Sequence, residues 1–237
     1  MDIVALSLVA VVAGALTTIT GFGGGLVLLL AATAIEGPLP ALGATALALL
    51  AANAHRVWLY RANVNARITG VMGRGLAAGA LLGAWFVSAI PPRAVHAIMV
   101  MVVGFGVVHA CARWQWRPRP RTLSISAALV GVLASGAGGA GFLIGPLVLA
   151  TGLAGRDYLA TVAASSLAMH VARVIGYGLT GVLTLHVAWL GLVLAPALFL
   201  GNLLGDRLHR RVPDAWQRRL ELGAPVVCIA LALAGIG

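Results

Sequence analysis

The stretch Gly21-Phe-Gly-Gly-Gly25 interrupts a long apolar run near the start of the chain, and Gly136-Ala-Gly-Gly-Ala-Gly141 interrupts another near its middle. A glycine in a helix interior costs about 1 kcal/mol relative to alanine. Backbone groups left unsatisfied in hydrocarbon are costlier still. Two such clusters at matching places therefore indicate discontinuous membrane segments that line a binding site, which is typical of transporters built from repeats.

The composition around these clusters is that of a membrane protein. Of the 237 residues, 61% are hydrophobic and only 9% are charged, whereas a soluble domain carries about 25% charged residues. The apolar runs are long and rich in Leu, Ala and Val, without the alternating segments of about ten residues that an outer-membrane barrel shows. The sequence therefore predicts an all-α, polytopic membrane protein.

Apolar runs and helix-breaking residues predict ten helical elements. The pairs that flank the glycine clusters include segments shorter than the roughly 20 residues of a full span. Each pair is either a tight hairpin or a helix joined to a partly inserted segment, and the sequence leaves both alternatives open. The predicted elements are residues 3–20, 24–35, 40–60, 68–90, 93–110, 122–136, 141–153, 157–180, 185–207 and 215–236.

The two sides of the chain align with each other. The pattern Asn53-x-x-Arg56-x-x-x-Tyr60 matches His170-x-x-Arg173-x-x-x-Tyr177 at an offset of 117, and other matches lie within one residue of that offset. This predicts a duplicated unit of about five elements. We expect a first membrane repeat at 1–112, a cytoplasmic connector at 113–121 and a second repeat at 122–237.

Arginine placement predicts that the two repeats are inverted. The net charge of +10 comes from arginines that cluster between apolar runs, where positive-inside loops belong, so it does not indicate nucleic-acid binding. In the first half, the loop after the third element is the basic one. In the second half, the equivalent loop at 181–186 has no arginine and the following loop is basic. Equivalent loops then lie on opposite sides of the membrane, and both termini lie outside.

The helices that begin after the glycine clusters are expected to bind an anion. The start of a helix presents unpaired N–H groups and the positive end of its dipole, so it can hold an anion without a charged side chain. The alternative is that the glycines only allow close helix packing, and we favour that reading for Gly14, Gly79, Gly83 and Gly201. The candidate binding residues at the two clusters are Thr20, Gly23, Gly24, Gly25, Ser135, Gly139 and Gly141.

Two arginines inside apolar helices are further candidates. A charged residue in the membrane interior costs at least roughly 2.5 kcal/mol, so it usually faces a pathway or a partner. Asn53 shares a helix face with Arg56, and His170 shares one with Arg173. These four residues predict two cationic stations along an anion route. For Arg56, snorkelling to the inner headgroups is an equal alternative.

No cofactor or metal is expected. The two cysteines lie far apart without a CxxC pattern, and the chain has no HExxH sequence. The six acidic residues lie at or near element ends, so we expect no carboxylate within the membrane to carry protons or bind Na⁺.

The chain resembles the sulfite exporter TauE/SafE family of membrane permeases. A glycine-rich motif of that family is repeated here at residues 21–30 and 138–146. Leu30 departs from the family pattern where the first copy usually has proline, and Ala140 interrupts the second glycine cluster. The resemblance implies transport of sulfur-containing anions such as sulfite, sulfoacetate or other organosulfonates.

These observations predict a multi-pass permease of the bacterial inner membrane that moves a small anion, sulfite or an organosulfonate, by alternating access between inverted halves. Its partners would be that anion and the lipid bilayer. A membrane-embedded enzyme and a non-transporting scaffold subunit are the alternatives. The sequence leaves the exact substrate, the direction of transport, the coupling ion and the oligomeric state open.

Overall fold

The structure is a computed structural model that describes residues 2–21, 23–91, 93–95, 97–98, 101, 118–138 and 140–209. These residues form helices and no strand, which confirms the predicted all-α class. The predicted element at 215–236 and most of those at 93–110 and of the connector lie outside the described residues. The described elements are α1 (Asp2–Thr20), α2 (Gly24–Glu36), α3 (Pro38–Leu59), the 3-10 turn η1 (Arg61–Asn63), α4 (Ala66–Ala89), α6 (Pro120–Ala137), α7 (Ala140–Leu149), α8 (Gly155–Leu179) and α9 (Leu185–His209).

Both glycine clusters separate two helices, as predicted. The helices that follow them begin at Gly24 and Ala140, each within one residue of the predicted position. Gly21, Gly23 and Gly138 have positive φ angles of 85°, 92° and 63°, which residues with a side chain rarely adopt. The predicted end of α7 at residue 153 is wrong, because the chain leaves the helix at Leu149 and turns at Gly152, where φ is 85°.

Among the described residues, four helices are long and apolar enough to cross a membrane, namely α1, α4, α8 and α9. By contrast, α2 has 13 residues and α7 has 10, so they are about 20 and 15 Å long and cannot cross the hydrocarbon core alone. A Cβ atom at Gly24 would collide with the Ala13 carbonyl and the Thr17 hydroxyl. The first cluster is therefore the turn of a tight hairpin, in which α2 folds back along α1.

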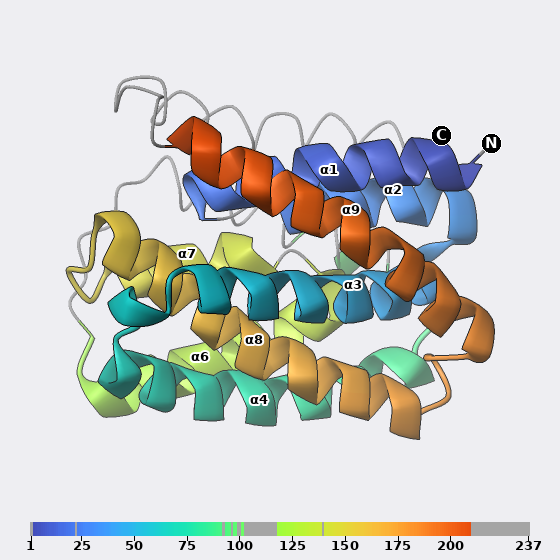
Figure 1. Cartoon of the computed structure of the whole chain (residues 1–237). Coiled ribbons are helices and arrows are strands. Elements are labelled where there is room, and N and C mark those ends of the chain that lie inside the picture. Colours follow the sequence, from blue (N-terminus) through green and yellow to red (C-terminus); the bar gives the residue numbers. More distant parts are fainter. Residues whose placement is uncertain are drawn as a thin grey trace.

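At the centre of the bundle, α3 and α8 pack against each other in opposite directions (Figure 1). Arg173, near the end of α8, reaches the Leu42 carbonyl near the start of α3 at 3.5 Å. At the other end, the Asn65 amide donates to Thr161 Oγ1 in the second turn of α8, at 3.2 Å. Of the four candidate spans, α8 is the most deeply buried.

Two outer groups pack on this central pair. α4 packs against α6 and α8, and α9 packs against α1 and α3. In the predicted repeats, α1, α3 and α4 correspond to α6, α8 and α9. Replacing each helix by its counterpart therefore turns one of these two groups into the other. Glycines make the close contacts: a Cβ at Gly79 would collide with the Ala128 backbone, and one at Gly201 with the Val11 carbonyl.

The packing interpretation of these glycines is thus confirmed. The remaining two, Gly14 and Gly83, also lie against the backbone of the facing helix. In both groups the packed helices run parallel. Residue numbers along α4 and α6, or along α1 and α9, rise together from contact to contact.

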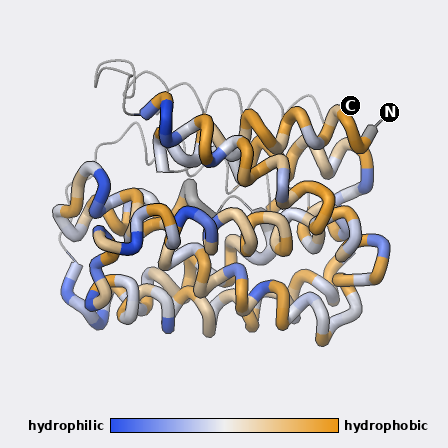
Figure 2. The backbone as a smooth tube through the Cα atoms, viewed as in Figure 1, coloured by the Kyte–Doolittle hydropathy of each residue, from blue (hydrophilic) through white to orange (hydrophobic). Residues whose placement is uncertain are grey.

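Hydrophobic residues prevail along the helices, and most hydrophilic residues lie near the helix ends (Figure 2). Trp85 and Phe86 on α4 and Leu192 and Leu200 on α9 are exposed, as expected of side chains that face lipid. The starts of α4, α6 and α8 and the end of α9 lie at one end of the bundle (Figure 1). Each of these four termini carries an arginine, at positions 67, 121, 156 and 207. We call this the arginine-rich end.

Candidate functional site

Arg56 lies in the last turn of α3, toward the arginine-rich end, and is 2% exposed. Its Nη1 donates to Asn53 Oδ1 at 3.3 Å, and Asn53 Nδ2 donates in turn to the Leu49 carbonyl at 2.8 Å. Asn53 thus holds one edge of the guanidinium. The Nε and Nη2 groups of Arg56 are buried without a hydrogen-bond partner among the described residues.

Tyr158, in the first turn of α8, lies against the first glycine cluster. Its ring lies directly against Gly21, where an added Cβ would stand 2.7 Å from the ring. Tyr158 also lies in the neighbourhood of Arg56. We call Arg56, Asn53, Tyr158 and Gly21 the Arg56 station.

Arg173 is fully buried in α8 and is held on several sides. Nη1 lies 3.4 Å from His170 Nδ1, and Nη2 donates to the Tyr177 hydroxyl at 3.2 Å and to the Leu42 carbonyl. Donation to Nδ1 requires the neutral His170 tautomer that carries its proton on Nε2. Among the described residues, no carboxylate forms an ion pair with Arg173 or Arg56.

Tyr177 joins Arg173 to the second glycine cluster. Its hydroxyl donates to the Ser135 carbonyl, three residues before Gly138. We call Arg173, His170, Tyr177 and Ser135 the Arg173 station. A tyrosine of α8 therefore lies near each buried arginine and beside one glycine cluster. Tyr158 and Tyr177 are 19 positions apart, or about 28 Å along the helix.

The glycines and hydroxyls predicted to bind the anion have structural contacts of their own. Thr20 Oγ1 donates to the Leu16 carbonyl and Ser135 Oγ to the Ala80 carbonyl, each at 2.9 Å. Gly24 packs on α1, and Gly25 contacts Leu49.

Gly23 accepts the first helical bonds of α2, from Leu26 and Val27. The amides of Gly24 and Gly25 therefore precede the first intrahelical bond. In the second cluster, Gly141 falls in the first turn of α7, and Gly139 lies outside the described residues. Gly138 contacts Leu29 of α2, which brings the two broken segments into contact.

Several buried polar residues near the stations had no role in the sequence analysis, among them Tyr158, Ser165 and Asp206. The sequence places Asp206 near a helix end, but the structure buries it to 8% exposure, and its Oδ1 accepts the Tyr60 hydroxyl at 2.9 Å. The four-residue spacing from Asn202, which is also buried, is the signal that Asp206 faces the bundle interior.

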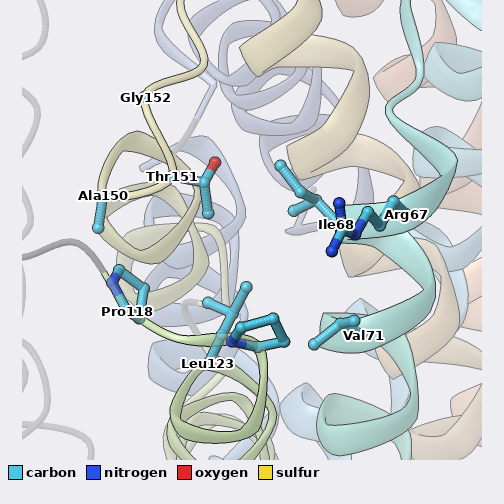
Figure 3. Close-up of a pocket in the computed structure, with 9 residues that line it drawn as sticks. Arg67, Ile68, Val71, Pro118, Leu123, Ala150, Thr151 and Gly152 are labelled. Carbon is cyan, nitrogen blue, oxygen red and sulfur yellow. The ribbon is translucent and has the colours of Figure 1, made fainter.

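A cavity of about 420 Å³ opens at the arginine-rich end, and its lining includes no residue of either station (Figure 3). Arg67 and Ile68 at the start of α4 face Thr151 and Gly152 of the α7–α8 loop across it. Neither buried arginine lines this cavity. In the part of the chain that the structure describes, no three His, Cys, Asp or Glu side chains group as metal ligands do.

A helical bundle with an apolar outer surface, half-length helices and buried arginines defines a polytopic membrane protein with a cationic interior. The chain matches the family described as "Sulfite exporter TauE/SafE" over residues 6–234 of its 237, and it therefore belongs to this family. Membership implies a membrane transporter of sulfur-containing anions. No curated protein and no solved structure matches the chain.

Proposed function

We propose that the protein transports a small sulfur oxyanion or organosulfonate, with sulfite as the first candidate, by alternating access between two inverted halves. The anion binds at the Arg56 station and leaves by way of the Arg173 station, or travels in the reverse direction. The glycine clusters supply backbone amides beside each arginine. The protein acts as a transporter in the bacterial inner membrane, with the arginine-rich end in the cytoplasm, as the positive-inside rule requires.

The open Nε and Nη2 edge of the Arg56 guanidinium supports this proposal most directly. A buried cation without an ionic partner is costly, and Arg56 keeps two N–H groups, Nε and Nη2, without any acceptor among the described residues. These two groups form the edge with which arginine binds an oxyanion in bidentate fashion. Snorkelling, the alternative for Arg56, leads a side chain to the water interface, whereas Arg56 is 2% exposed.

The arrangement of helices supports the inverted repeat. The counterparts α3 and α8 run in opposite directions, and the remaining packed pairs exchange when the halves are exchanged. A two-fold axis in the membrane plane would produce this pattern. On this basis we retain the repeats 1–112 and 122–237, joined by a cytoplasmic connector at 113–121.

A row of buried polar residues on α8 supports a route between the stations. Thr161, Ser165, Ser166 and His170 lie between Tyr158 and Arg173 and are at most 4% exposed. The Ser165 hydroxyl has no hydrogen-bond partner among the described residues. In a conformation that separates α8 from α3, this row would line the anion path.

The test replaces Arg56 with methionine, which keeps the length of the side chain and removes the charge. Arg74→Met is the matched control, because Arg74 is exposed and its side chain donates to the Gly70 carbonyl of its own helix. Purified proteins would be screened by thermal shift against sulfite, sulfate, thiosulfate and several sulfonates, and sulfite uptake would be measured in proteoliposomes. We expect R56M to lose the anion-dependent shift and at least about 90% of uptake, since a charge-assisted bidentate contact is removed. R74M should behave like the natural protein. Equal uptake by R56M and R74M would refute the role of Arg56.

A further inference from the structure

The two buried arginines each have a tyrosine four residues later, and the two tyrosines bond differently. Tyr177 lies against its own arginine, with its hydroxyl 3.2 Å from Arg173 Nη2 and 3.4 Å from Nε. Tyr60 instead donates its hydroxyl to Asp206 Oδ1 at 2.9 Å. The nitrogens that Tyr177 contacts on Arg173 are the same two that lack a partner on Arg56.

The packing of α9 against α3 and α1 keeps Asp206 beside Tyr60. Asn202, one turn earlier, donates to the Ala52 carbonyl at 3.0 Å and accepts the Thr18 hydroxyl at 3.0 Å, so this part of α9 is fixed against α3 and α1. The first half has no equivalent acid at the matching position. At the offset that aligns Gly83 with Gly201, Asp206 corresponds to Ser88, which bonds the Trp85 carbonyl of its own helix.

We propose that Asp206 is a positioning residue: it holds the Tyr60 hydroxyl away from Arg56 and thereby keeps the guanidinium edge open for the transported anion. This inference rests on the proposed function of Arg56 as an anion site. A carboxylate suits the task because it only accepts hydrogen bonds and binds a hydroxyl more strongly than a neutral acceptor does. Without Asp206, Tyr60 would turn onto Arg56 as Tyr177 turns onto Arg173, and would compete with the anion.

If the Tyr60 hydroxyl competes with the anion for Arg56, removing that hydroxyl should restore sulfite affinity to a variant that lacks Asp206. A purely structural role of Asp206 predicts no such rescue. Asp206→Ala should raise the KM for sulfite uptake about tenfold, since a hydroxyl then occupies the guanidinium edge. The double variant D206A/Y60F removes the competing hydroxyl as well, and its KM should return to within about twofold of that of Y60F. Y60F alone should stay within about twofold of the natural protein, because its guanidinium remains open.

Asp206→Asn separates positioning from charge. The amide oxygen can still accept the Tyr60 hydroxyl, so the KM of D206N should stay within about threefold of the natural value. If Asp206 acted only by repelling the anion, D206N and D206A would both bind sulfite more tightly. That result, or a double variant no better than D206A, would overturn the inference.

The failure of this inference can be told apart from failure of the proposed function. If R56M transports sulfite normally, Arg56 is not the site and the proposed function fails first. If R56M is inactive and D206A/Y60F shows no rescue, only the role of Asp206 fails. Should D206A not fold, Y60F and D206N decide the matter, and a KM raised tenfold in Y60F would overturn the inference.

Discussion

Arg56 and Arg173 stand at the same place in two matching sequence patterns, yet their surroundings differ. Arg173 uses its guanidinium to bind a histidine, a tyrosine and a carbonyl of α3. Arg56 binds only Asn53 and leaves two N–H groups without a partner among the described residues. A shared helix register therefore does not determine what a buried arginine contacts, because its hydrogen-bond partners also come from the neighbouring helices.

The Tyr177 hydroxyl occupies the Nε and Nη2 edge of Arg173, whereas the same edge of Arg56 is open among the described residues. An alternating-access transporter needs two states that differ in which side of the site is available. We expect the state that faces the other side of the membrane to release Arg173 from Tyr177.

The largest effect is expected for Arg173→Ala. This change removes the hydrogen bonds to Tyr177, His170 and Leu42 from a fully buried position. It should lower the free energy of unfolding by at least about 3 kcal/mol, because bonds to a charged group are lost and a cavity remains. Sulfite uptake should be abolished. Thermal unfolding in detergent and uptake in proteoliposomes measure the two effects.

Arg56→Ala is the comparison for this prediction. It removes a cation whose burial is poorly compensated, so the unfolding temperature should change much less than in R173A. Arg173→Lys keeps the charge but loses the planar guanidinium. Its unfolding temperature and sulfite uptake should lie between those of R173A and those of the natural protein. Equal losses of stability in R56A and R173A would show that the two stations do not differ as described.

Much of the architecture was predictable from the sequence, because it depends on local features. Apolar runs predict the helices, and glycine clusters predict their interruptions at Gly24 and Ala140 to within one residue. The two arginine patterns also follow from simple spacing. The tertiary partners could not be predicted in this way: Asp206 faces Tyr60 across 146 positions, and Tyr177 bonds a carbonyl of α6. Such contacts depend on how α9 and α6 pack on the central pair.

A second prediction tests whether the two outer groups of helices are equally tight. Gly79→Ala and Gly201→Ala each place a Cβ against the backbone of a facing helix, at Ala128 and Val11 respectively. Backbone cannot move aside as a side chain can, so each variant should lose about 1–3 kcal/mol of stability. Gly70→Ala is the control, because nothing lies within 4 Å of its added Cβ. Alanine favours a helix there, so the control should gain up to about 1 kcal/mol.

If the halves match in packing as they do in sequence, G79A and G201A should lower the unfolding temperature by similar amounts. A large loss in one and none in the other would show that a single outer group holds the bundle together. Loss of stability in G70A as well would contradict the assignment of these glycines to close helix contacts.

The smallest effect is expected between the two stations, at Ser165. Its hydroxyl is fully buried and has no partner among the described residues, and such a group costs about 1–3 kcal/mol. Ser165→Ala should therefore raise stability by up to about 1 kcal/mol while slowing sulfite uptake about two- to fivefold, because the anion loses a donor on its path. Ser88→Ala, which removes a hydroxyl that bonds only within α4, should change neither uptake nor stability by a comparable amount. A stabilised S165A with unchanged uptake would mean that the polar row on α8 is not the route that joins the Arg56 and Arg173 stations, and the anion would then have to cross between α8 and another helix.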